Sequence, residues 1–297
     1  MKSKPHSAMP QNRTVARLLF AEETDMGGLP LRQPLPTSQV EQHDPFLLLH
    51  HLTTTVQQSD YPYKLGVDPH PHRGFSPVTF VYQGGVHHRD SRGNDSVVWA
   101  GGTQWMNAAR GIVHSERPPR EMQEQGGVQE IVQLWVNTPK SLKMEQPAYF
   151  ALQAEDTPVI SEDEGGVQIA VVAGEYKSTR GPVNSPSTAM VLRLTLQPGG
   201  RCTLPIPADH NAMLYLLDGQ VMLEGYGLVD GQHLALLNRE GESCTITARQ
   251  DTRLLLLSGK PLDEPLAMHG PFVMNTQTEV MQAMRDYQMG KMGMLFE

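Results

Sequence analysis

The chain has 297 residues, 39% of them hydrophobic, and a formal net charge of −8. The acidic balance argues against a surface that binds nucleic acid directly, and the apolar fraction is unlike that of a disordered chain. Two cysteines are too few for a secreted disulfide scaffold, no signal-peptide pattern opens the chain, and no apolar run could cross a bilayer. We therefore expect a cytoplasmic protein without membrane contacts.

Short strand patterns separated by turn signals fill the first half of the chain. Residues 30–36 are rich in proline, and we expect no regular structure there. The predicted strands cover residues 14–20, 44–52, 78–82, 86–90, 96–99, 104–108 and 129–137. This succession indicates an antiparallel sandwich or barrel. The interior of a small barrel can hold a metal ion and one small ligand.

The second half repeats the same rhythm after a predicted connector at residues 138–165. Its predicted strands cover residues 167–173, 190–196, 202–206, 213–217, 219–224, 233–237, 244–248 and 253–258. Two halves with one rhythm suggest an internal duplication. The tail carries a predicted helix, capped by Asn275 or Thr276 and ending near Gly290.

Two pairs of metal-ligand side chains stand at the ends of the segment 69–117. His70 and His72 form one pair, and His114 and Glu116 form the other. On a strand, residues i and i+2 point to the same face, so each pair can aim at one point. If two strands bring these points together, the result is a site of three histidines and a carboxylate, which suits iron, manganese, cobalt, nickel, copper or zinc. The alternative is exposed strand histidines, or histidines bonded to backbone carbonyls.

The metal-ligand pattern does not recur in the second half, where His210 and His233 are isolated. His50 and His51 are adjacent, so on a strand only one of them can face a cavity. We expect hydrogen bonding from these two, not metal ligation.

Several motifs resemble those of the pirins. They are His-Pro-His-Arg-Gly-Phe at 70–75, His-Arg-Asp-Ser at 88–91, Gln-Trp-Met at 104–106, Gly-Ile-Val-His-Ser-Glu at 111–116 and Arg-Asp-Tyr-Gln at 285–288. The resemblance implies an all-β chain of two tandem cupin domains, which are jelly-roll barrels, with a short C-terminal helix. We expect a metal-binding N-terminal cupin at 1–145. The C-terminal cupin at 146–297 would lack a metal and end in a helix that packs back on the barrels.

The resemblance also implies the ligand set and the metal. Pirins bind one divalent ion, usually Fe²⁺, through three histidines and a glutamate, which match His70, His72, His114 and Glu116 here. Several pirins resemble quercetin 2,3-dioxygenases in activity, and a nuclear pirin is an iron-dependent transcriptional co-regulator.

The sequence departs from the family pattern at two places near the expected site. Ser76 stands where the family usually has a glutamate, and His50 stands where it usually has an aspartate. Loss of a negative charge near a metal can change the tuning of the metal and the substrate pocket.

Our leading hypothesis is a metal-dependent dioxygenase that opens the central ring of a flavonol such as quercetin with O₂. Glu116 would be the catalytic residue that takes the proton of the flavonol 3-hydroxyl. The alternative is an iron-binding regulatory protein that acts through a protein partner, and a third is a purely structural metal site. Ligand type does not select among the metals, and the sequence fixes neither the physiological substrate nor the oligomeric state.

Overall fold

The computed structural model describes residues 11–58 and 65–296, which form two compact units. The major unit contains Ala21–Pro158, Val171–Met190 and the chain from Gly259 onward. The minor unit contains the residues up to Phe20, Val159–Ala170 and Val191–Ser258. The predicted division after residue 145 stays a prediction. The two units each draw on segments from both sides of it.

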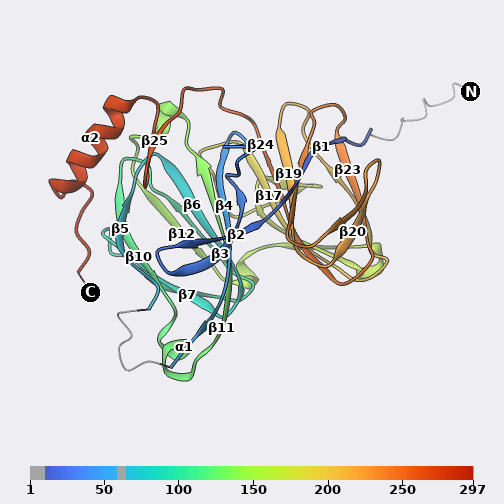
Figure 1. Cartoon of the computed structure of the whole chain (residues 1–297), viewed down its shortest axis with the longest axis horizontal. Helices are drawn as coiled ribbons and strands as arrows, with labels where there is room; N and C mark the ends of the chain where they lie inside the picture. The colour runs from blue at the N-terminus through green and yellow to red at the C-terminus, as the bar shows by residue number, and fades with distance from the viewer. Residues whose placement is uncertain (1–10, 59–64, 297) are drawn as a thin grey trace, which may run out of the picture. The chain divides into compact units, whose positions relative to one another are not determined.

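The major unit is built on two antiparallel sheets (Figure 1). The seven-stranded sheet has the order β12-β9-β6-β11-β4-β3-β2, and the four-stranded sheet has the order β5-β10-β7-β8. Val81 of the first sheet packs with Val86 and Val98 of the second in one buried cluster, so the sheets face each other across a common core. The strand bounds are β2 Glu22–Met26, β3 Leu29–Leu35, β4 Phe46–Val56, β5 Val67–His72, β6 Phe75–Gln83, β7 Gly85–Asp90, β8 Asp95–Trp99, β9 Thr103–Asn107, β10 Ile112–Arg117, β11 Gly127–Asn137 and β12 Ala148–Leu152.

Short elements complete the major unit. They are the helix α1 Arg120–Gln125, the strand pair β15 Glu175–Tyr176 and β16 Thr179–Arg180, the strand pair β25 Ala267–His269 and β26 Phe272–Met274, and the helix α2 Gln277–Gln288. No helix in residues 11–58 and 65–296 is long and apolar enough to span a bilayer.

The minor unit also has two sheets. One has the order β1-β22-β19-β24-β17-β14-β13 and the other the order β18-β23-β20-β21. Strand β1 pairs antiparallel with β22, so the start of the described chain belongs to the sheet of the second half. The bounds are β1 Val15–Phe20, β13 Val159–Glu162, β14 Val167–Ala173, β17 Ala189–Leu196, β18 Arg201–Pro205, β19 Asn211–Asp218, β20 Gln220–Leu223, β21 Gly227–Asp230, β22 His233–Leu237, β23 Ser243–Ala248 and β24 Thr252–Gly259.

Two segments predicted to be irregular are strands. The proline-rich segment is β3, because Pro30 lies opposite Asp25 in a hairpin with β2, and Pro34 lies where the pairing with β4 is interrupted, between Arg32 and Leu35. A proline at such an irregularity removes no regular ladder hydrogen bond. The predicted connector contains β12 and β13, which pair with β9 and β14 respectively.

The C-terminal helix α2 confirms the predicted helix and its cap. The Thr276 side chain accepts a hydrogen bond from the backbone N–H of Glu279 at 3.2 Å, which satisfies one unpaired donor of the first turn. Val280 packs in one buried cluster with Ala267 of β25 and Met274 of β26. The helix therefore packs on the β25–β26 hairpin of the major unit (Figure 1).

A buried ion pair fixes α2 to the end of β5. Arg73 Nη1 donates to Asp286 Oδ2 at 2.9 Å, and the two side chains are only 5% and 11% exposed. Hydrogen bonds from Lys291, Arg73 and Gln282 outweigh the effect of burial and lower the pKa of Asp286 to about 2. Because this pKa is below the ordinary carboxyl value, the contribution to stability is complete above about pH 4 and is lost as the pH falls toward 2.

Replacing Asp286 by Asn should destabilise the docked helix. Removing one partner of a buried ion pair leaves an uncompensated charge and costs about 3–5 kcal/mol. We expect faster hydrogen exchange of the α2 amides in Asp286→Asn than in the wild type at pH 7, and a smaller difference near pH 2. The control is Glu124→Gln, which breaks an exposed pair with Arg120. Equal protection of α2 in all three proteins would contradict the proposed anchor.

Candidate metal centre

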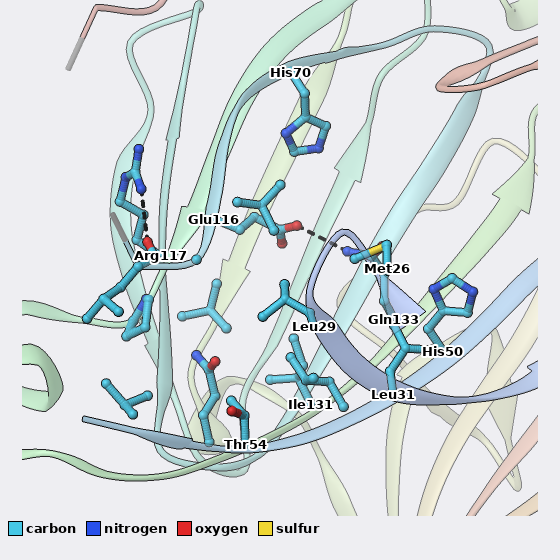
Figure 2. A pocket seen from close by; sticks show the side chains of 18 of the residues that line it. Met26, Leu29, Leu31, His50, Thr54, His70, Glu116, Arg117, Ile131 and Gln133 are labelled. Atoms are coloured by element: carbon cyan, nitrogen blue, oxygen red, sulfur yellow. Dashed lines mark hydrogen bonds between the residues drawn. The ribbon is translucent and has the colours of Figure 1, made fainter. Parts of the chain in front are cut away.

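Strands β5 and β10 pair antiparallel and bring the predicted histidines together. His114 lies opposite His70, and Ile112 lies opposite His72. One ring nitrogen from each of His70, His72 and His114 lies within 4.8 Å of the others. In Figure 2, His70 points into the pocket toward the Glu116 carboxylate. The first histidine pair therefore does share one face, as its i, i+2 spacing predicted.

The hydrogen bonds of the rings leave nitrogen lone pairs in the cluster. His70 Nδ1 must donate to the carbonyl oxygen of Asp68, at 2.8 Å, so Nε2 of a neutral His70 is an acceptor. His70 Nε2 and His72 Nε2 are 3.1 Å apart, which suits one shared proton or a shared cation. His114 Nε2 is buried and has no hydrogen-bond partner. Buried polar atoms usually have hydrogen-bond partners, so an unpartnered ring nitrogen at this position is consistent with a metal ligand.

The buried rings are in the protonation state that binds metals. Burial, followed by the neighbouring His70, lowers the pKa of His72 well below its usual value. Burial also lowers the pKa of His114, and the neighbouring histidines add to the effect. Both rings are therefore neutral near pH 7, and neutral imidazole is the form that ligates a metal.

Glu116 lines the same pocket as His70 and His72 but is outside the cluster of three histidines. Among the described His, Cys, Asp and Glu side chains, the group of three ligand atoms contains only the histidines. The β5–β10 register shifts between His114 and Glu116, so the two do not continue one regular ladder. Glu116 Oε1 accepts from Thr79 at 3.1 Å and from Gln104. Its Oε2 accepts from Gln133 at 3.1 Å, which is the dashed contact in Figure 2.

The pocket is a cavity of about 490 Å³ in the major unit. His70, His72 and Glu116 line one part of it. The apolar walls come from the β2–β3 hairpin and from strands β4, β5, β7 and β11. They include Met26, Leu29, Leu31, Leu52, Val67, Val86, Ile131 and Trp135. A mostly apolar cavity with a few convergent polar groups is typical of a small-molecule site.

The two departures from the pirin pattern have different places in the structure. His50 lines the pocket, and burial lowers its pKa to about 4, so the ring is neutral. Its Nε2 donates to Gln33 Oε1 at 3.0 Å, because Gln33 Nε2 is already donating to the Pro36 carbonyl. Ser76 is fully buried and is not among the residues that line the pocket.

His51 bonds to buried Glu130 at 3.2 Å. Neither His50 nor His51 is in the histidine cluster, and both form hydrogen bonds, as expected.

Several polar residues of the site had no role assigned to them from the sequence, although Gln104 and His88 stand in the pirin-like motifs. Thr79, Gln104 and Gln133 hold Glu116, and His88 approaches His114. The i, i+2 series of polar and aromatic residues on β11 could have indicated the pocket face. It consists of Gln129, Ile131, Gln133 and Trp135, all of which line the pocket. Alternation along a strand does not distinguish a face that meets solvent from a face that lines a cavity, as this one does.

Comparisons with known proteins identify the family of this chain. The family profile described as Pirin matches residues 28–136, and the profile described as Pirin C-terminal cupin domain matches residues 191–293. A pirin-like protein of Caulobacter vibrioides is 39% identical, over 94% of this chain and 99% of that protein. A pirin-like protein of Solanum lycopersicum is 35% identical, over 94% of this chain and 92% of that protein.

A solved structure supports the same assignment. The crystal structure of a quercetin 2,3-dioxygenase from Acinetobacter baumannii is 35% identical, has a TM-score of 0.89, and matches 96% of this chain and 100% of that chain. The predicted all-β fold, with two cupin domains and a short C-terminal helix, is confirmed. The chain belongs to the pirin family.

Proposed function

We propose that this chain binds one divalent metal ion, Fe²⁺, through His70, His72 and His114, with Glu116 as the fourth ligand. The observation that carries the proposal is the convergence of three imidazole nitrogens within 4.8 Å of one another, at an apolar pocket. Imidazole ligands suit Fe²⁺ and also Mn, Co, Ni, Cu and Zn ions. Iron is proposed from the resemblance to pirins.

We further propose that the site oxidises a flavonol such as quercetin with O₂ and opens its central ring. When bound, the ion would act as a Lewis acid toward the flavonol 3-hydroxyl and support the reaction with dioxygen. The apolar walls of the pocket suit a flat aromatic molecule, and a relative at 35% identity is named as a quercetin 2,3-dioxygenase.

Glu116 is the proposed proton acceptor. Three side-chain donors, from Thr79, Gln104 and Gln133, point at its oxygens and fix the position of the carboxyl group. Trp135 Nε1–H, which can only donate, bonds to Gln133 Oε1 at 3.3 Å and so turns the Gln133 amide nitrogen toward Glu116. Glu116 is thus fixed at the pocket wall, within reach of a hydroxyl group presented there.

Metal content should depend on the histidine cluster. We expect about one metal ion per chain in the wild type and a large loss in His72→Ala and His114→Ala, because each change removes one of the three histidine ligands. The control is His87→Ala, whose ring pairs with Asp95 at 2.7 Å outside the cluster. Elemental analysis of protein purified without added metal measures this. Full occupancy in both cluster variants would contradict the proposed ligands.

Catalysis should depend on Glu116 as a base. In Glu116→Gln the side chain keeps its size but cannot take a proton, and we expect kcat for aerobic quercetin oxidation to fall by about 10²–10⁴-fold. The iron content of each variant is measured first, so that loss of metal is not mistaken for loss of the base. Equal turnover by the metal-loaded wild type and Glu116→Gln would rule out this role. Absence of turnover, with metal-dependent capture of one stoichiometric protein partner, would favour the regulatory alternative.

A further inference from the structure

Two buried polar side chains lie behind His114 and have no part in the proposed reaction. They are His88 and Asp90 on β7, the strand that pairs with the other edge of β10. The His88 side chain and the Asp90 side chain are both 0% exposed. His88 Nδ1 lies 3.3 Å from His114 Nδ1, and His88 Nε2 lies 3.0 Å from Asp90 Oδ2. The three side chains form a continuous chain that leads away from the pocket.

The donors around Asp90 determine which nitrogen of His88 carries a proton. Asp90 Oδ1 accepts from the backbone N–H groups of Arg92, at 2.8 Å, and Asn94, at 3.1 Å. Asp90 Oδ2 accepts from the amide nitrogen of the Asn94 side chain at 2.7 Å. These three groups can only donate, so both carboxylate oxygens act as acceptors. His88 Nε2 must then donate its proton to Asp90.

The protonation of His88 determines which nitrogen of His114 carries a proton. A neutral His88 with a proton on Nε2 has a bare Nδ1, which can only accept. His114 Nδ1, 3.3 Å away, must therefore carry the proton, and His114 Nε2 is left with its lone pair. That nitrogen is one of the buried side-chain atoms without a hydrogen-bond partner. A stack with Tyr149, with 4.1 Å between ring centroids and 10° between ring planes, holds the His88 ring in place.

We propose that Asp90 and His88 are positioning residues that set the tautomer of His114 and so present its Nε2 to the metal. The proposal rests on the assignment of His114 as a ligand in the proposed function, and not on flavonol oxidation. His70 receives the equivalent support from the carbonyl oxygen of Asp68. Support of this kind fixes the ring orientation and raises the basicity of a histidine ligand.

The binding test compares three variants, with Zn²⁺ as the probe and a competing chelator. His88→Phe keeps an aromatic ring beside Tyr149 but has no acceptor for His114. We expect its Kd for Zn²⁺ to rise by about 10–100-fold. His88→Gln offers an oxygen acceptor and an N–H donor on one side chain and should restore most of the loss. His87→Phe is the control, because the His87 ring pairs with Asp95 and is 29% exposed.

A second measurement reads the tautomer directly. In metal-free wild type with ¹⁵N-labelled histidine, NMR should show His114 with a proton on Nδ1 and a bare Nε2. In His88→Phe it should show a mixture of tautomers. A wild-type His114 protonated on Nε2, or a folded His88→Phe with wild-type affinity, would overturn the proposal. If His88→Phe does not fold, the NMR measurement of the His114 tautomer in the wild type is sufficient to test the proposal. Neither measurement uses a flavonol or O₂, so failed turnover would leave this result intact.

Discussion

The antiparallel pairing of β5 with β10 is the constraint on which the site depends. Its register sets His70 opposite His114 and keeps His72 on the same face, so that three imidazoles meet without any contribution from a loop. A slip of one residue would turn every side chain of one strand to the other face and disperse the cluster. The buried ion pair between Arg73, next to His72, and Asp286 connects the end of β5 to α2.

The central place of β10 in its sheet explains how one short strand can serve several roles. On one side it pairs with β5, which supplies two histidines, and on the other with β7, which supplies His88 and Asp90. Across the core, β6, β9 and β11 of the facing sheet direct Thr79, Gln104 and Gln133 at Glu116. The carboxylate therefore joins the two sheets, while the histidines stay within one.

Much of this architecture could be predicted from the sequence, because it depends on local patterns. Strand periodicity located most strands, and the i, i+2 spacing of His70 and His72 predicted their common face. Local patterns do not predict which distant segments pair, or in which register. The contact of His88 with His114, the interruption at Pro34 that lets β3 pair, and the cavity beneath Gln133 all depend on the register between strands. The register shift between His114 and Glu116 could not be predicted either. In the sequence these two residues have the same i, i+2 spacing as His70 and His72.

The central proposal is that three histidine side chains share one cation. X-ray absorption at the zinc K-edge of protein loaded with one equivalent of Zn²⁺ tests this most directly. We expect the multiple-scattering signature of about three imidazoles, with nitrogen atoms at about 2.0–2.1 Å from the metal. A first shell of oxygen atoms alone, without imidazole scattering, would show that the metal binds elsewhere and would contradict the account.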